Sequence, residues 1–383
     1  MHEVRSPDEE VGEAPLRVVH VVQHLKGGGA ETLVRGLCAG LARQGIAVTV
    51  VSIYPDGLEE SERAALGFPV VSVERCSRTD VGFFPRLVTT LRKLAPDVVH
   101  AHLHAGKYAG RLAALTARSP ALVFTEHGDE AGGALRQAVN RVLHPRTTRF
   151  ITFSDTQRLR FSAAEHVPLE QIAVIPNGVD APPAGDRGAL RAALGIAPEV
   201  FAVYLPARMT AQKNQALALR AFARAWRGDA WRKLYFAGAG PLEGDLQRLA
   251  DTLELAGRVH FLGFRNDAAT LCRAMDLFLM TSLWERMPLA LGEAMRAGLP
   301  VVTTPWTGYE DFVRDGETGF VAEGDDVDSF ARALVRAQDD VARRRVAERA
   351  RVFADERFDL GVSVRRHIAL YRSLAPRASR GSR

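Results

Sequence analysis

The chain has 383 residues, of which 47% are hydrophobic and 25% are charged, and its net charge is +5. This composition predicts a globular protein of about two domains. No apolar run approaches the ~20 residues of a membrane span, and the acidic opening "MHEVRSPDEEVGEAP" is unlike a signal peptide. Aromatic residues make up only 7% and the basic residues form no stripe, so we expect no nucleic-acid partner.

Apolar runs alternate with amphipathic segments through the first half of the chain. Leu16–Leu25 is apolar and is followed by glycines, which predicts a buried parallel strand. Residues 33–41 then carry apolar side chains at helical spacing, and Gly45 is placed to end that helix. Further strands are expected in "IAVTVVSIY", "DVVHAHLH", "ALVFTEHG" and "RFITFS". This alternation predicts a parallel sheet with helices on both faces.

The segment "IPNGVDAPPAGD" (175–186) has turn residues and no apolar period, so it is interpreted as a linker. Strands are then expected in "VFAVYLPAR", "KLYFAGAG", "VHFLGF", "LFLMTS", "PVVTT" and "TGFVAE". We therefore predict an α/β protein of two Rossmann-like doubly wound domains, with bounds 16–180 and 181–358. The segments 1–15 and 377–383 are expected to be tails, and the last helix, about 360–376, can pack back on the first domain. Ligands of such sheets bind at the loops that follow the strands.

Two loops of the first half are candidates for ligand binding. "HLKGGGAE" has three consecutive glycines, unlike a dinucleotide fingerprint, but Gly28 and Gly29 allow a ligand to approach backbone amides. A tight structural turn is the alternative. His127 follows another strand in "TEHGDE", and we favour a role in a pocket over a structural one.

Three histidines alternate in "VVHAHLHAG", and they would lie on one side of a strand that continued through His104. His100, His102 and His104 resemble a set of metal ligands, but no carboxylate lies in the same loop. Histidines at strand ends often only form hydrogen bonds, so we expect no metal site.

In the second half, Arg208 and Lys213 follow a strand in "LPARMTAQKNQ". Two cations near the start of a helix can bind a diphosphate, whereas a pair of solvated surface charges is the alternative. Gly240, in "FAGAGPLEG", marks another turn that allows close approach, although this signal is weak alone.

The most informative segment is "ERMPLALGE", which places Glu285 before a helix and Glu293 inside it. Pro288 suits the first turn of a helix, which is expected to end at Gly298. Amides near Met287 and Leu289 would then point between the two acids, in an arrangement that can hold a nucleotide sugar. An acid near a helix start can also simply complement the helix dipole.

These motifs resemble the retaining glycosyltransferases of the GT-B fold, often called group 1, from Arg17 to about Leu374. The E-x7-E element is the most specific part, and "HLKGGGAE", "DVVHAH", "FTEHG", "VIPNGVD", "AGAGPL" and "DGETGFV" accompany it. The resemblance implies two domains that face a cleft. It also implies transfer of a sugar from a nucleoside-diphosphate donor to a hydroxyl, in bacterial cell-envelope, exopolysaccharide or glycolipid assembly.

The resemblance also implies roles for individual residues. Arg208 and Lys213 would hold the donor diphosphate, and Glu293 would bind the ribose hydroxyls. Glu285 would contact the donor sugar, with His127 lining the sugar pocket. The remaining donor contacts would come from Met287, Pro288, Leu289, Gly240, Gly28 and Gly29. The family commonly has a small residue after the first glutamate, so Arg286 bears on the choice of donor sugar.

The resemblance implies no cofactor and no metal, with the nucleotide sugar as a co-substrate. A nucleotide-sugar epimerase of the same fold and a non-catalytic nucleotide- or sugar-binding module are the alternatives. We expect a saccharide or lipid-linked acceptor and a cytoplasmic location, including the inner face of the plasma membrane. Arg136, Arg141, Arg146 and Arg149 can contact such a surface, or they can form a solvated helix face.

Overall fold

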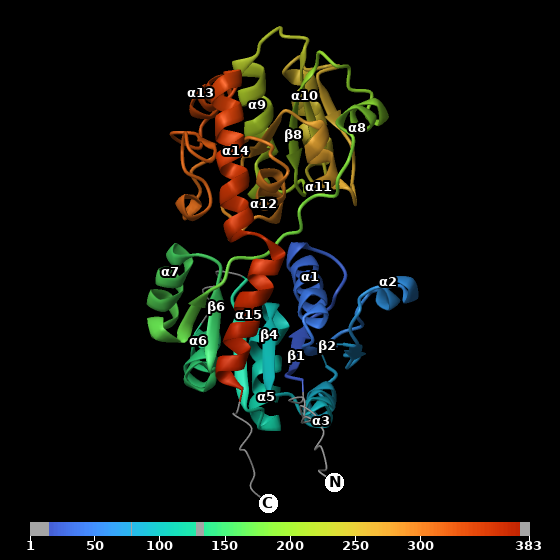
Figure 1. Cartoon of the computed structure of the whole chain (residues 1–383), viewed down its shortest axis with the longest axis vertical. Coiled ribbons are helices and arrows are strands. Elements are labelled where there is room, and N and C mark those ends of the chain that lie inside the picture. Colours follow the sequence, from blue (N-terminus) through green and yellow to red (C-terminus); the bar gives the residue numbers. More distant parts are fainter. Residues whose placement is uncertain (1–14, 78, 128–133, 376–383) are drawn as a thin grey trace, which may run out of the picture. The chain divides into compact units, whose positions relative to one another are not determined.

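The computed structural model describes residues 15–77, 79–127 and 134–375 (Figure 1). Seven strands form one sheet in the order β3-β2-β1-β4-β5-β6-β7, and six form another in the order β10-β9-β8-β11-β12-β13. The pairs that join β1 to β2 and β8 to β9 are parallel. The prediction of two doubly wound α/β sheets is confirmed.

The strands of the first sheet are β1 (Arg17–Val22), β2 (Ala47–Ser52), β3 (Val70–Ser72), β4 (Val98–His102), β5 (Ala121–Thr125), β6 (Arg149–Thr152) and β7 (Ile172–Val174). Those of the second are β8 (Phe201–Pro206), β9 (Arg232–Ala237), β10 (Val259–Phe261), β11 (Leu277–Met280), β12 (Val301–Thr303) and β13 (Phe320–Val321). Sequence reasoning missed β3 and β7. Both lie at the edges of their sheet and have three residues each, so neither produces a long apolar run.

The helices that follow the first strands are α1 (Gly29–Arg43), α2 (Glu60–Ala64), α3 (Phe83–Leu94), α4 (Leu103–Ala105), α5 (Arg111–Ala117), α6 (Ala134–Leu143) and α7 (Asp155–Glu165). Those of the second half are α8 (Arg187–Ala193), α9 (Gln215–Ala225), α10 (Glu243–Thr252), α11 (Ala268–Leu271), α12 (Leu289–Arg296), α13 (Val327–Arg336), α14 (Asp340–Arg357) and α15 (Leu360–Leu374). In the part of the chain that the structure describes, no helix has the length and apolar character needed to cross a membrane.

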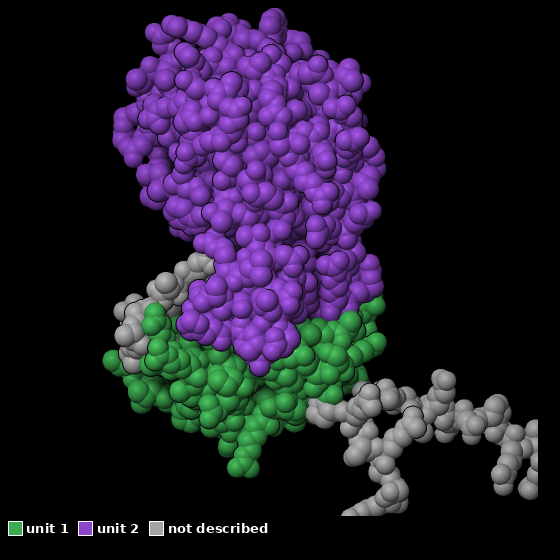
Figure 2. Space-filling view, turned by 90° about the vertical axis from the view of Figure 1, so that its left-hand side faces the viewer, with its two compact units in different colours: residues 1–126, 132–150, 368–383 green, residues 127–131, 151–367 purple. Residues whose placement is uncertain are grey.

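The chain divides into two compact units, coloured separately in Figure 2. One contains residues 1–126, 132–150 and 368–383, and the other contains residues 127–131 and 151–367. The division falls within β6, whereas a domain boundary near residue 180 remains a prediction based on the linker.

Strand periodicity explains the core around the second sheet, because successive side chains point to opposite faces. Tyr204, Tyr235 and Phe278 pack in one apolar cluster with residues of α12 and α14. Their neighbours Val203 and Phe236 pack in another cluster with residues of α9 and α13. Both faces of this sheet are therefore buried by apolar contacts.

The first sheet has one apolar face and one face that carries buried histidines. Val19, Val21 and Val99 pack against residues of α3 and α5. His20 and His100 occupy the alternate positions of β1 and β4, and both are fully buried. This polar layer was not expected from a strand that reads as a continuous apolar run.

Candidate functional site

The loops that follow β8 and β11 are tied together by hydrogen bonds within the second unit. The Thr281 hydroxyl donates to the carbonyl of Lys213 at 2.8 Å, and the amide of Leu283 donates to the carbonyl of Gln212 at 2.8 Å. Lys213 ends a short 3-10 turn, η4 (Ala211–Lys213). These contacts fix the backbone of Lys213 beside the segment that leads to Glu285.

Lys213 and Glu285 form a close ion pair through Nζ and Oε1. The Ser282 hydroxyl donates to the same carboxylate oxygen at 2.6 Å. The side chain of Glu285 is 8% exposed and that of Lys213 is 23% exposed. The lysine predicted to bind a diphosphate and the glutamate predicted to contact the sugar are thus in direct contact.

Helix α12 begins one residue after Pro288, which is its N-cap and has an extended ψ of 119°. No side chain caps this helix, so its first amides, beginning at Leu289, face the site without a side-chain acceptor. Met287 is buried, and its sulfur accepts a hydrogen bond from the amide of Asn177. The prediction of a helix that starts at Pro288 and stops before Gly298 agrees with the structure, where Gly298 has a φ of +73°.

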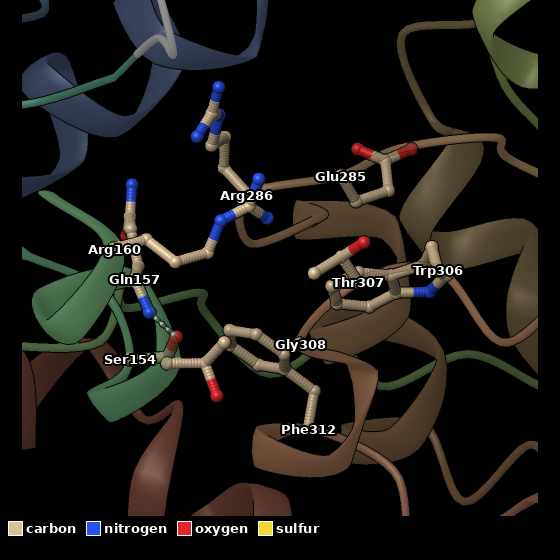
Figure 3. Close-up of a pocket in the computed structure, with 10 residues that line it drawn as sticks. Ser154, Gln157, Arg160, Glu285, Arg286, Trp306, Thr307, Gly308 and Phe312 are labelled. Atoms are coloured by element: carbon tan, nitrogen blue, oxygen red, sulfur yellow. Dashed lines mark hydrogen bonds between the residues drawn. The ribbon is translucent and has the colours of Figure 1, made fainter. Parts of the chain in front are cut away.

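Glu285 lies on the border of two pockets in the second unit. The first comprises about 270 Å³ of space unoccupied by atoms, part of it open to solvent, and we call it the lysine pocket. It is lined by Leu205, Pro206, Ala207, Lys213, Phe278, Leu279, Met280, Thr281, Ser282, Glu285, Pro288 and Ala290. The second encloses about 320 Å³, part of it open to solvent, and we call it the arginine pocket. It is lined by Ser154, Thr156, Gln157, Arg160, Glu285, Arg286, Trp306, Thr307, Gly308 and Phe312 (Figure 3).

Arg208 and Glu293 lie outside the lining of both pockets. Arg208 is exposed, and its carbonyl accepts a hydrogen bond from the Gln215 side chain at 3.0 Å. Burial raises the pKa of Glu293, and its carboxylate adds to the burial-driven rise in the pKa of Tyr204 and Cys272. Glu293 therefore faces the side of the sheet that carries Tyr204, while Lys213 and Glu285 meet at the helix start.

Two glycines after β9 are required by close backbone contacts. A Cβ at Gly240 would lie 2.3 Å from the carbonyl oxygen of Met209, and one at Gly238 would lie 2.2 Å from that of Ala207. Gly238 also has a φ of +144°. Gly238 and Gly240 thus allow close packing against the backbone on either side of Arg208, which is a structural function.

The glycine-rich loop of the first unit is exposed at Gly28 and Gly29, where α1 begins. The amide of Gly28 donates to the carboxylate of Glu31 at 3.0 Å. Gly27, with a φ of +139°, supplies the unusual backbone conformation. One amide that we expected to be open to a ligand is therefore occupied by an acidic side chain.

His127 lies just after β5, and its ring centroid is 5.4 Å from that of Phe153. Loss of solvent around the ring lowers the pKa of His127 to about 4, so the imidazole is neutral near pH 7. A neutral imidazole can donate one hydrogen bond and accept another, which suits contact with sugar hydroxyls.

The strand does not continue through His104, because β4 ends at His102 and Leu103 takes a φ of +58° to start α4. His100 and His102 instead gather with His20, and the three could offer nitrogens to one metal ion. However, His20 Nδ1 lies 2.9 Å from His102 Nε2, and the nitrogens of His100 contact the hydroxyls of Tyr371 and Thr125 at 2.6 and 2.7 Å. The three histidines therefore form a hydrogen-bonded cluster, which links Tyr371 of α15 to the first sheet.

Sequence reasoning missed two groups of charged residues. Lys107 pairs with Glu126 at 2.8 Å, and both side chains are buried. Lys107 lies in a π-helical turn, η1 (Gly106–Gly110), a feature that leaves no clear mark in a single sequence. Arg160 lines the arginine pocket from α7, although nothing in its local sequence sets it apart from other helix-surface arginines.

Residues 201–340 match the family described as glycosyl transferases group 1, and residues 27–181 match glycosyltransferase family 4. The Escherichia coli UDP-Gal:alpha-D-GlcNAc-diphosphoundecaprenol alpha-1,3-galactosyltransferase is 34% identical over 268 residues. That alignment covers 66% of this chain and 69% of the relative. D-inositol 3-phosphate glycosyltransferase of Mycobacterium marinum is 31% identical over 68% of this chain and 61% of its own length.

Solved structures of the same fold cover nearly the whole chain. Anabaena HepE in complex with UDP matches with a TM-score of 0.80 and 25% identity, over 94% of this chain and 100% of that one. The same protein in complex with UDP and glucose matches with a TM-score of 0.79. WaaG, a glycosyltransferase involved in lipopolysaccharide biosynthesis, matches with a TM-score of 0.71 at 21% identity, which supports the fold.

Proposed function

The chain belongs to the glycosyltransferases of group 1, and from this membership we propose that it moves a sugar from a nucleoside-diphosphate donor to an acceptor hydroxyl with retention at the anomeric carbon. The contact of Lys213 with Glu285 beside the uncapped start of α12 carries the proposal. A cation, an acid and free amides around one pocket suit a diphosphate joined to a sugar. The UDP-sugar named for the E. coli relative and the UDP bound to HepE favour UDP as the nucleotide of the donor.

The bond that must break joins the anomeric carbon of the sugar to a phosphate oxygen. Negative charge grows on the diphosphate as this bond lengthens, and Lys213, Arg208 and the amides of α12 stabilise that charge in the transition state. The acceptor oxygen forms its bond on the same face, and its proton passes to the departing phosphate oxygen. Glu285 holds the sugar hydroxyls, and Glu293 binds the ribose diol.

We place no metal in this reaction, because Arg208 and Lys213 supply two positive charges to the diphosphate. Chelation with EDTA should leave the rate of transfer within about twofold, since arginine and lysine provide charge-assisted hydrogen bonds without a metal. A loss of activity that Mg²⁺ or Mn²⁺ restores would contradict this part of the proposal.

The acceptor is proposed to be a saccharide or a lipid-linked sugar used in cell-envelope, exopolysaccharide or glycolipid assembly. The lipid-linked substrate named for the E. coli relative supports this class. Arg141 and Arg146 are exposed on the first unit, and Val142 between them is 55% exposed. A basic segment with an exposed apolar side chain suits contact with an anionic membrane surface.

A panel of nucleotides and nucleotide sugars, tested for thermal stabilisation, is the first experiment. A ligand that binds only the folded state raises the melting temperature by mass action. Glu293→Ala should remove the shift given by the best nucleotide while the variant melts as a folded protein. Release of nucleoside diphosphate with a new glycoside separates a transferase from an epimerase and from a binding module. If no member of the panel shifts the melting temperature, the proposal fails.

A further inference from the structure

The arginine pocket borders the lysine pocket at Glu285, which lines both. Two of its other lining residues are Arg160 and Arg286. Neither arginine lines the lysine pocket, where the donor diphosphate is proposed to bind. Figure 3 shows the side chain of Arg160 reaching from α7 toward the loop that carries Arg286, on the opposite side of the pocket from Trp306. The pocket thus gathers cationic groups that the diphosphate does not require.

The backbone that carries Arg160 is held in place at the first turn of α7. The Ser154 hydroxyl accepts from the amide of Gln157 at 3.2 Å, and the Gln157 side chain accepts from the amide of Phe153 at 2.8 Å. The amide of Thr156 donates to Asp311 at 3.1 Å. A preorganised support of this kind lets a charged side chain bind a ligand with little loss of entropy.

The loop on the other wall is fixed against the same helix. Gly308 has a φ of +86°, and a Cβ at this position would lie 3.3 Å from Thr156 Cγ2. This close packing sets Trp306 and Thr307 opposite the arginines. Trp306 is 3% exposed, so it forms a rigid wall.

The carboxylate of the pocket is already engaged elsewhere. Glu285 Oε1 accepts from Lys213 and from Ser282, so its charge is shared with the lysine pocket. Arg160 is exposed and forms no ion pair among the residues that the structure describes. Guanidinium groups match carboxylate and phosphate oxygens in both charge and geometry.

We infer that Arg160 and Arg286 bind an anionic group of a substrate, either a carboxylate or a phosphate. This inference rests on the transferase function proposed above. The group has two sources: a carboxylate on the donor sugar, as in a nucleoside-diphosphate hexuronate, or the phosphates of a lipid-linked acceptor. In either case the pair selects a charged substrate over a neutral one of the same size.

The test uses the full chain and the variants Arg160→Gln, Arg286→Gln and the double variant. Arg349→Gln is the matched control, because Arg349 is an exposed arginine on α14 outside both pockets. Binding of UDP, UDP-glucose and UDP-glucuronate is measured by calorimetry. Transfer is then measured to a sugar diphospholipid and to the same sugar on a neutral alkyl chain.

If the anion belongs to the donor, the wild type prefers UDP-glucuronate to UDP-glucose, and each arginine variant reduces this preference about 10- to 100-fold, as expected for a hydrogen bond between charged groups. If it belongs to the acceptor, the variants raise the KM for the diphospholipid by a similar factor and leave the KM for the neutral acceptor unchanged. Affinity for UDP alone should stay at the wild-type level.

Two negative outcomes are distinguishable. In the first, the wild type binds UDP but shows no selectivity between charged and neutral substrates, or both arginine variants keep that selectivity. This outcome overturns the role of the two arginines and leaves the proposed function standing. A wild type that neither binds UDP nor consumes any donor overturns both.

Discussion

Lys107 and Lys213 form short ion pairs with a glutamate, one in each unit, whereas Lys26 lies 3.8 Å from both Glu59 and Glu62. The side chains of Lys107 and Glu126 are 5% and 7% exposed, whereas Lys213 is 23% exposed and lines a pocket with Glu285. Beside the first pair, the guanidinium of Arg111 is also buried and donates twice to the hydroxyl of Thr147.

The surroundings explain why the same chemistry has two uses. The Lys107 ammonium lies 5.9 Å from the ring centroid of Phe124, in a region that water does not reach. Opposite charges there mainly compensate each other's desolvation. The pair of Lys213 with Glu285 borders a pocket and the uncapped start of α12, so the lysine can interact with a ligand. The comparison predicts that removing each lysine damages a different property.

The largest effect is expected for Lys107→Met. Loss of the ammonium removes the positive charge that lies 2.8 Å from the buried carboxylate of Glu126, which should lower the free energy of unfolding by about 4 kcal/mol. Urea denaturation measures the change. Lys107→Met combined with Glu126→Leu removes both charges and should recover most of the loss. If Lys107→Met alone melts like the wild type, the pair does not have this structural role.

Lys213→Met should instead act on turnover. Removing one preorganised cation from a developing charge costs about 10²- to 10³-fold in kcat/KM. The loss of stability should be smaller than for Lys107→Met, because the Lys213 side chain is more exposed and solvent reaches this edge of the pair. Steady-state kinetics and urea denaturation of the same preparation separate the two effects. A fall in stability that accounts for all the lost activity would contradict the comparison.

Sequence reasoning located the strand-to-helix loops of the site, because apolar runs and the glycines after them are local signals. It placed Lys213 near Glu285 only through the family resemblance. It could not find the pair of Lys107 with Glu126, since nineteen positions and an irregular helical turn separate them. The histidine cluster was also out of reach, because His20 joins it from a strand that reads as apolar.

Acid should destabilise the second unit through His367, a buried residue of α15. Burial lowers the pKa of His367 to about 4, and its Nδ1 nitrogen donates to the carbonyl of Ser363 at 2.9 Å. As the pH falls from about 6.5 to 4, the imidazole of His367 is protonated in the unfolded chain but stays neutral in the folded chain. The free energy of unfolding therefore falls by about 3 kcal/mol.

His367→Gln should flatten the loss of stability across this pH window, measured by urea denaturation at steps from pH 7 to pH 4. His166→Asn is the matched control. His166 is an exposed histidine with a φ of +54°, a conformation that asparagine tolerates. An acid slope that is the same in His367→Gln and in the wild type would show that this imidazole does not govern it.

The smallest effect is expected for Glu293→Gln. This change should stabilise the ligand-free protein but weaken its binding of UDP. Burial raises the pKa of Glu293, and none of the described residues forms a hydrogen bond or an ion pair with its carboxylate. The folded chain therefore holds this proton more tightly than the unfolded chain, so stability falls as the pH rises through the raised pKa. Glutamine removes that penalty and should stabilise the ligand-free protein by about 1 kcal/mol at pH 7.

The same change should weaken binding of UDP about tenfold, because an amide is a poorer acceptor for the ribose hydroxyls than a carboxylate. Calorimetry with UDP and thermal melting without ligand give the two quantities from one protein. A variant that melts lower and binds UDP as tightly as the wild type would mean that Glu293 serves the fold. The ligand-binding role of the second unit would then rest on the pair of Lys213 with Glu285 alone.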